Sequence, residues 1–257
     1  MKIHRCLGPA IALMLGACGS AAAQRGTPST LPQGSAAVRL DPADFTTDIT
    51  NPYWPMKPGT RWTFRERTMD GSESQAVITV TNQTRTLANG ITGRVVRDTL
   101  TAGGSIVEDT IDWYAQDKAG NLWYLGEDTA EFASGKVSST GGSFEAGAGG
   151  AQPGIAVPAA PTPGLTYRQE YLKGEAEDNG EVLSVREQAQ VPTGHYDDVL
   201  LTKDTSAIEG DALEYKLYAK GVGPVLVLTA SGGDSREELV RVDTAPDGSG
   251  TGPLGAP

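Results

Sequence analysis

The strongest constraint on the fold of this chain is an alternation of apolar and polar side chains with a period of two. The alternation runs through residues 61–65, 107–114 and 213–220. Successive side chains of an extended strand point to opposite faces, so this pattern predicts β-strands. Beyond residues 1–17, no window of twelve residues shows the 3.6-residue period of a helix. We therefore expect an all-β chain.

Dipeptides that favour tight turns separate the alternating segments, among them Asp70-Gly71, Asn89-Gly90 and Asn179-Gly180. About a dozen short strands in succession predict an antiparallel meander. Such a meander forms an open curved sheet or a partial barrel that resembles a half-barrel. Beyond the three segments above, we expect strands near 75–83, 91–100, 121–127, 131–138, 166–173, 180–190, 197–205, 224–230 and 236–243.

Residues 139–165 interrupt this pattern because they are rich in Gly, Ala and Pro. Such a composition fits a linker between two halves of a sheet. However, Phe144, Ile155, Val157 and Leu165 punctuate the segment, and a pure linker needs no such side chains. We favour a long ordered loop laid across the sheet, which is a common place for binding.

The N-terminal segment has the organisation of a secretory signal. Basic residues precede the apolar run Leu7–Leu15, and the run is too short to span a bilayer. The run ends in Leu15-Gly16-Ala17-Cys18, which resembles a bacterial lipobox, so we expect cleavage before Cys18 and attachment of lipid to its thiol. An ordinary signal cut after Ala23 is the alternative. Lipidation predicts the outer membrane of a Gram-negative cell, or the outer face of the plasma membrane of a Gram-positive one.

These observations divide the chain into a signal peptide (1–17), a lipidated cysteine with a flexible tether (18–40), a single β domain (41–243) and a disordered tail (244–257). The tether and the tail are assigned from their Gly-, Ser-, Thr- and Pro-rich composition. Cys6 and Cys18 are the chain's two cysteines. The processed protein would therefore contain no disulfide and no thiol for catalysis or metal binding.

The charge balance excludes one class of partner. The chain carries 21 basic and 32 acidic residues, a net charge of −11, and loss of Lys2 and Arg5 with the signal would change it to −13. Nucleic-acid binding needs clustered Lys and Arg, so we expect no nucleic-acid partner. A surface this acidic also disfavours anionic lipid head groups. The general consequence of this charge is solubility, and a more specific one is affinity for a cationic ligand.

The densest cluster of functional side chains lies in a predicted hairpin over residues 107–131. Its carboxylates and aromatic rings could form a site for calcium, a sugar or a cationic ligand, although the spacing does not match a calcium-binding EF-hand loop. The simpler interpretation is aromatic packing on one face and a solvated acidic face on the other. The candidate ligand- or metal-binding residues are Glu108, Asp109, Asp112, Asp117, Trp113, Trp123, Glu127 and Asp128.

Catalytic motifs are weak or missing in the sequence. It contains no G-x-S-x-G, no phosphate loop and no dinucleotide fingerprint. After processing, His195 is the one remaining histidine, in a turn-like context, and this count excludes a zinc site built from several His or Cys ligands. We assign no catalytic residue and no cofactor, with calcium kept open.

Several segments resemble a family of uncharacterised secreted bacterial lipoproteins. The resemblance covers roughly residues 50–243, and it implies a curved antiparallel half-barrel of the bacterial envelope but no activity. Trp54 and Met56 stand where the resemblance predicts smaller aromatic residues or leucine. The segments that carry it are Pro52–Thr60 with Trp62, Asp112–Asp117, Gly120–Tyr124, Tyr167–Tyr171 and Tyr218–Gly223.

Together, the sequence predicts a lipid-anchored envelope protein that acts as a non-enzymatic binding or structural module. In addition to the membrane that holds its lipid, its partner would be a small molecule, a lipid or another envelope protein. The alternative is an envelope hydrolase, or a calcium-dependent site, built on the acidic and aromatic hairpin 107–131.

Overall fold

The structure is a computed structural model that describes residues 31–257. Over this range the chain forms one short 3₁₀ helix and sixteen strands, which confirms the all-β prediction. The elements are η1 (Pro42–Asp44), β1 (Phe45–Thr46), β2 (Thr60–Arg67), β3 (Glu73–Thr86), β4 (Thr92–Ala102), β5 (Ser105–Asp117), β6 (Leu122–Ala133), β7 (Lys136–Ser139), β8 (Phe144–Glu145), β9 (Gln152–Val157), β10 (Thr166–Arg168), β11 (Glu170–Tyr171), β12 (Asp178–Val191), β13 (Gly194–Ser206), β14 (Leu213–Ala219), β15 (Gly223–Ser231) and β16 (Arg236–Thr244).

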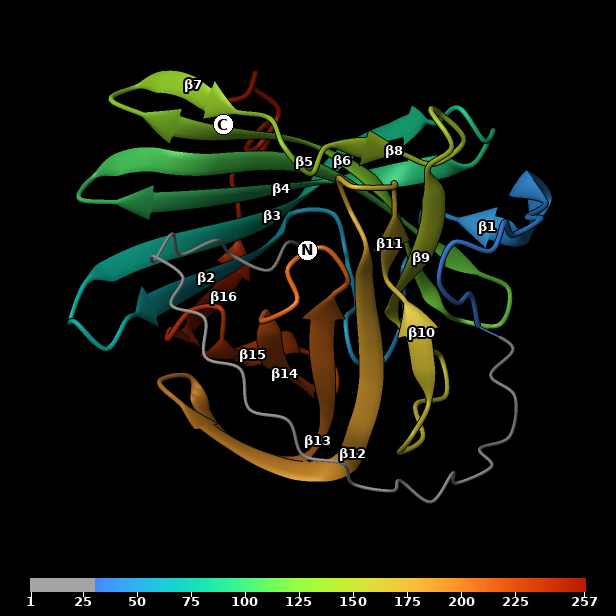
Figure 1. Ribbon diagram of the computed structural model, residues 1–257. Helices are drawn as coiled ribbons and strands as arrows, with labels where there is room; N and C mark the ends of the chain where they lie inside the picture. Colours follow the sequence, from blue (N-terminus) through green and yellow to red (C-terminus); the bar gives the residue numbers. More distant parts are fainter. Residues whose placement is uncertain (1–30) are drawn as a thin grey trace, which may run out of the picture.

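The strands form an antiparallel sheet that curls into a nearly closed barrel (Figure 1). The main path follows the order β10-β12-β13-β14-β15-β16-β2-β3-β4-β5-β6-β9-β11. Most neighbours are consecutive in the chain, as in the predicted meander. The non-consecutive neighbours are β10 with β12, β6 with β9, β9 with β11, and β16 with β2. In the last pair, Leu239 pairs with Phe64 and joins the two ends of the domain. The fold is thus a more completely closed version of the expected partial barrel.

The two ends of this path, β10 and β11, are separated in the chain by Gln169 alone, so the chain itself crosses the remaining seam. The side chain of Arg168 fills it. Arg168 is 1% exposed, and its guanidinium donates to the carbonyl of Pro153 on β9, at 2.8 Å from Nη2. Burial lowers the pKa of Arg168 to about 10, which leaves the side chain charged at neutral pH. Hydrogen bonds from one side chain therefore replace a strand ladder at the seam.

The proline-rich segment before β2 packs an aromatic cluster into the barrel. Trp54 is 1% exposed and contacts the rings of Trp62, Tyr114 and Tyr218 at centroid distances of 6.5, 5.6 and 6.0 Å. The backbone of Gly223 comes so close that a Cβ atom there would lie 2.9 Å from Trp54 Cδ1. The aromatic residues of this segment therefore belong to the core.

Residues 139–165 are ordered, as we favoured, but they do not simply cross the sheet. They contain β8 and β9, and both strands pair with β6. Phe144, Ile155 and Val157 are buried, which explains why a segment of linker-like composition carries them. The segment therefore extends the sheet, and β9 leads to the seam.

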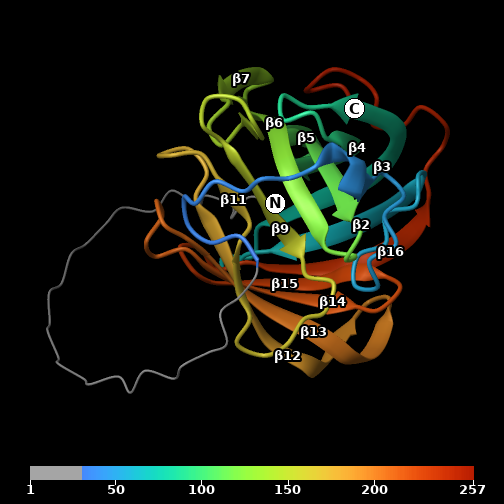
Figure 2. The ribbon, with the colours of Figure 1, turned by 90° about the vertical axis from the view of Figure 1, so that its right-hand side faces the viewer.

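The structure differs from the expected tether at residues 31–40, which we call the N-terminal strap. The strap lies along the seam, in blue in Figure 2, and Arg168 Nη1 donates to the carbonyls of Gly34 and Ala36 at 2.6 and 2.8 Å. Leu31, Val38 and Leu40 pack against the core. A composition that favours flexibility is overridden here because the buried arginine needs acceptors. Cys18 and the rest of the expected tether, residues 18–30, lie outside the described residues, as does the signal peptide 1–17.

The C-terminal segment also differs from its expected disorder. Residues 245–257, which we call the C-terminal tail, fold back over β4 and β5. Arg97 donates to the carbonyls of Gly252 and Pro253 at 2.7 and 2.8 Å. The backbone N–H of Gly255 donates to Asp109 Oδ2 at 2.6 Å. These bonds come from the tail's main chain, so its Gly- and Pro-rich composition carries no sign of them.

Candidate functional site

The hairpin β5–β6 presents carboxylates to the inside of the barrel. Pairing places Asp112 directly opposite Glu127 and Glu108 directly opposite Glu131, while between them the hydroxyls of Thr110 and Thr129 lie 2.7 Å apart. Like charges on directly opposed residues destabilise a sheet. The inner face of the hairpin therefore carries a repulsion that sheet packing alone would not favour.

A bulge in β6 creates this arrangement. Tyr114 pairs with Tyr124, but Trp113 pairs with Gly126, so one residue of β6 is skipped. The skip turns Glu127 inward and leaves Asp128 exposed on the outside. Gly126 has φ of +137°, and a Cβ atom there would lie 2.2 Å from the carbonyl oxygen of Phe144 on β8. Glycine is required at this position because β8 approaches the bulge so closely.

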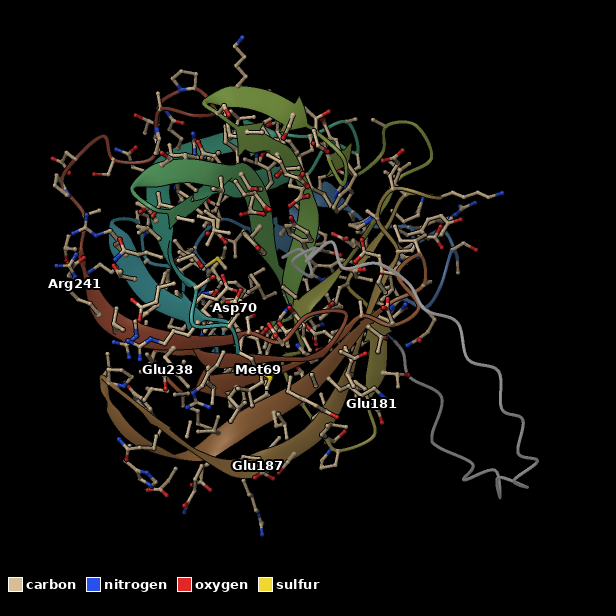
Figure 3. The ribbon with its side chains drawn as sticks, turned by 60° about the vertical axis from the view of Figure 1, so that its left-hand side comes forward. Met69, Asp70, Glu181, Glu187, Glu238 and Arg241 are labelled. Carbon is tan, nitrogen blue, oxygen red and sulfur yellow. The ribbon has the colours of Figure 1, made fainter. Side chains whose placement is uncertain are left out.

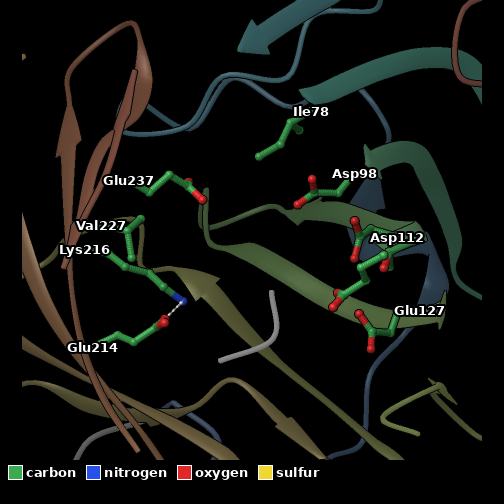
Figure 4. A pocket seen from close by; sticks show the side chains of 10 residues that line it. Ile78, Asp98, Asp112, Glu127, Glu214, Lys216, Val227 and Glu237 are labelled. Carbon is green, nitrogen blue, oxygen red and sulfur yellow. Dashed lines mark ion pairs between the residues drawn. The ribbon is translucent and has the colours of Figure 1, made fainter. Parts of the chain in front are cut away.

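The inward side chains line a cavity of about 40 Å³, which we call the acidic lumen (Figure 4). Six of its ten lining residues are acidic, and they face one lysine. Two walls contribute: β3, β4, β5 and β6 on one side, and β14, β15 and β16 on the other. The lining residues are Ile78, Asp98, Glu108, Thr110, Asp112, Glu127, Glu214, Lys216, Val227 and Glu237.

Tyr124 links the two opposed carboxylates of the β5–β6 wall. Its hydroxyl lies 2.7 Å from Asp112 Oδ1 and 2.8 Å from Glu127 Oε2, and its ring stacks on Tyr114 at 5.0 Å. Burial, reinforced by the charges of Asp112 and Glu127, raises the pKa of Tyr124 well above its ordinary value. The phenol thus stays neutral, and its single hydrogen is shared between two carboxyl groups.

Lys216 is the cation on the opposite wall. Its Nζ lies 2.8 Å from Asp204 Oδ2 and 3.5 Å from Glu214 Oε2, and the side chain is 1% exposed. Burial lowers the pKa of Lys216, but the nearby Asp204 and Glu214 more than offset this and raise it above its ordinary value. The ammonium is therefore charged and already committed to two carboxylates, so it cannot neutralise the far wall.

Further polar side chains surround Asp204. Gln169 Nε2 donates to Asp204 Oδ2 at 2.9 Å, and Thr202 donates to Oδ1 at 3.0 Å. Asp178 lies on the neighbouring strand β12, and burial raises its pKa to about 6. The β12–β14 wall is thus acidic as well, and it holds a carboxyl group that titrates near neutral pH.

Three of the eight predicted site residues reach the acidic lumen: Glu108, Asp112 and Glu127. The other five lie elsewhere on the hairpin. Asp109 is buried on the outer face with Arg97, and Asp117 accepts from the indole N–H of Trp123 at 2.8 Å within the β5–β6 turn. Trp113 lies under the guanidinium of Arg85 at 4.2 Å, Trp123 packs edge-on against Phe45 at 5.8 Å, and Asp128 is exposed.

Sequence reasoning missed the lumen residues outside this hairpin. Asp98, Glu214, Lys216 and Glu237 come from three other strands, β4, β14 and β16. A signal for two of them was present, because the alternation in 213–220 places Glu214 and Lys216 on one face. In the structure that polar face points inward, whereas polar faces of sheets usually point to solvent.

Residues 31–257 contain no group of three or more His, Cys, Asp or Glu side chains arranged so that it could hold a metal ion. The same range contains no helix that is long and apolar enough to cross a membrane.

No protein-family model and no curated protein matches the chain. Two solved structures are similar to it at low sequence identity. One is a candidate exported protein with a YmcC-like fold from Bacteroides fragilis, with 16% identity and a TM-score of 0.45 over 75% of this chain and 99% of that one. The other is a candidate lipoprotein from Parabacteroides distasonis, with 13% identity and a TM-score of 0.40 over 74% of this chain and 98% of that one.

Proposed function

We propose that the protein is a lipid-anchored component of the bacterial envelope whose acidic lumen binds a small organic cation with an ammonium group. The anchor is inferred from Leu15-Gly16-Ala17-Cys18, and the ligand class is inferred from the charge of the lumen. The protein acts in this proposal as a binding module and not as an enzyme.

The observation that carries the proposal is the unequal charge of the lumen walls. Asp112, Glu127 and Glu214 are each at most 5% exposed and line one cavity with Lys216. Burial of a charge is costly unless the charge is paired. Clusters of buried titratable groups in a cavity are typical of functional sites. The six acidic residues and one lysine of the lining give the lumen an excess of negative charge, which a bound cation would complement.

The size of the lumen restricts the ligand. A buried water molecule occupies about 10–15 Å³ by this measure, so 40 Å³ holds roughly three waters. An ammonium head group fits this space, whereas a lipid chain or a sugar ring does not. The size therefore favours a small amine over the lipid cargo that the sequence left open.

The ligand can be tested by measuring thermal melting of the detergent-purified full chain with methylammonium, putrescine and calcium. We expect an amine to raise the melting temperature of the wild type and to have a much smaller effect on Glu127→Gln and Asp112→Asn. Asp128→Asn is the matched control, because it removes a carboxylate from the exposed face of the same hairpin. Its response should equal that of the wild type.

Two results would contradict the cation proposal. The first is a wild-type protein whose melting temperature responds to none of the amines. The second is an amine effect that survives in both lumen variants. A shift with calcium that EDTA reverses, and that amines do not reproduce, would replace the amine with a metal ion.

The anchor has its own test. Labelling of growing cells with radioactive palmitate should mark the wild-type protein, and Cys18→Ser should lose both the label and fractionation with membranes. A Cys18→Ser protein that still fractionates with membranes would contradict lipid anchoring, without affecting the test of the lumen.

A further inference from the structure

A groove on the outside of the barrel has the opposite character to the lumen. It lies over β2, β3 and β16, has a volume of about 470 Å³, and is lined by Arg61, Thr63, Gln75, Val77, Val240 and Arg241. We call it the outer groove. Its lining contains two arginines and no carboxylate, in a chain of net charge −11. This face is therefore a local exception to the acidity of the protein.

The arginines are held in place by shared carboxylates. Asp243 accepts from Arg61 Nε at 2.8 Å and lies 3.0 Å from Arg241 Nε. The hydrogen bond from Arg61 lowers the pKa of Asp243, so the carboxylate stays charged. One carboxylate for two guanidiniums leaves a positive charge, and a guanidinium has five N–H donors, so several remain available for a ligand.

A second group of two arginines on one carboxylate lies beside the group formed by Arg61, Arg241 and Asp243. Glu238 lies 3.2 Å from Arg65 and 2.9 Å from Arg236. Figure 3 shows Glu238 and Arg241 on the outside of the barrel. The two groups together contain four arginines and two carboxylates, a net charge of +2.

The lining also contains a polar group that needs a partner. Thr63 is 5% exposed, and its Oγ1 has no hydrogen-bond partner within residues 31–257. A buried hydroxyl without a partner is unfavourable, and most buried polar groups in proteins are satisfied. Oγ1 is buried as Thr63 stands, but Thr63 lines the groove, and rotation about its Cα–Cβ bond would bring the hydroxyl to a bound ligand that supplies the missing hydrogen bond.

We propose that the outer groove binds the phosphate group of a small soluble phosphate monoester. Guanidinium groups bind phosphate oxygens in a two-pronged geometry. The net charge of +2, summed over the groove arginines and the adjoining arginines that contact Glu238, attracts a dianionic phosphate to this face. Thr63 Oγ1 would donate to one phosphate oxygen. A soluble ligand is favoured over a bilayer, because a concave groove admits a small molecule and the acidic protein is repelled by an anionic membrane.

Isothermal titration calorimetry of the full chain with glycerol phosphate in a phosphate-free buffer of low ionic strength tests this proposal. We expect measurable binding by the wild type, and no heat of binding with glycerol. Arg241→Gln and Thr63→Val should each weaken the affinity by at least about tenfold, because each removes a hydrogen bond to a charged ligand. Arg67→Gln is the matched control, since Arg67 lies on the same strand, is exposed and pairs with Glu73. Its affinity should stay within about twofold.

Thr63→Val separates binding from folding. Removal of an unsatisfied buried hydroxyl should leave the unfolding midpoint unchanged or raise it, while the affinity falls. Glu127→Gln should not change the affinity for glycerol phosphate, so this test is independent of the acidic lumen.

Three results would overturn the proposal. They are the lack of binding at millimolar glycerol phosphate, full affinity in both Arg241→Gln and Thr63→Val, and binding to phosphatidylglycerol vesicles without binding to glycerol phosphate.

Discussion

Strand β5 buries carboxylates on both of its faces, and the carboxylates of the two faces have different partners. On the outer face, Asp109 accepts hydrogen bonds from Arg97 Nε at 2.6 Å, from Thr99 at 2.8 Å and from the N–H of Gly255 at 2.6 Å. On the inner face, Asp112 stands opposite another carboxylate, Glu127, and the two share the hydroxyl of Tyr124. The outer face satisfies its charge within the protein, whereas the inner face concentrates charge of one sign.

This contrast separates a structural role from a candidate binding role. A buried charge with a full set of partners stabilises a unique fold, and loss of one partner is costly. A buried charge next to a like charge lowers stability, and such sites are retained where they serve binding or chemistry.

The largest effect is expected on the outer face. Arg97→Ala would leave Asp109 as a buried carboxylate without its cation, so we expect the free energy of unfolding to fall by about 3–5 kcal/mol. Urea denaturation measures this. Arg67→Ala is the control, because it breaks an exposed ion pair with Glu73 and should cost less than about 1 kcal/mol. A loss for Arg97→Ala no larger than that of the control would show that the outer pair is not structural.

A smaller effect is expected from Asp178, on the inner side of the barrel. Burial raises its pKa from 3.8 to about 6, so the folded state binds the proton more tightly than the unfolded state. The stability contributed by this proton is fully present below pH 3.8 and is lost as the pH rises through 6. Relative to the wild type, Asp178→Asn should therefore gain about 2–3 kcal/mol between pH 3.5 and pH 7.

Urea denaturation at several pH values measures the effect of Asp178→Asn. The exposed Asp211→Asn serves as the control and should follow the pH dependence of the wild type. A difference between Asp178→Asn and wild type that does not change with pH would contradict the prediction.

The smallest effect is expected at Glu127, and its sign is opposite to that of Arg97. Glu127→Gln removes one of two opposed like charges and keeps an acceptor for Tyr124. We expect the free energy of unfolding to stay the same or to rise by up to about 1 kcal/mol. Thermal and urea denaturation without added cation measure it. A loss above about 2 kcal/mol would mean that Glu127 stabilises the fold as Asp109 does, and the contrast between the two faces would disappear.

The local structure of this chain could be predicted from its sequence to a large extent. The alternation in 213–220 predicted a strand, and β14 spans Leu213–Ala219. The hairpin predicted over 107–131 is β5–β6. These elements follow from side-chain periodicity and turn residues, which are local properties.

The candidate site was only partly predictable, because alternation defines two faces but not which one points inward. Strict alternation along 121–127 would place Glu127 on the same face as Trp123. The bulge at Gly126 reverses this, and it depends on the close approach of β8. Closure through β2 and β16 brings Glu237 to the lumen, and that pairing joins segments about 170 residues apart. No local pattern contains this register.

The hydrogen bonds between Arg168 and the N-terminal strap have a mechanical consequence. The N-terminal strap is fastened at the seam, where side-chain and backbone contacts stand in for a ladder of paired strands. Tension on the polypeptide from its N-terminal side would load these few bonds before it reached any strand pair. Stretching from the two chain ends would therefore load the strap at one end and the C-terminal tail at the other before it loaded the strands of the barrel.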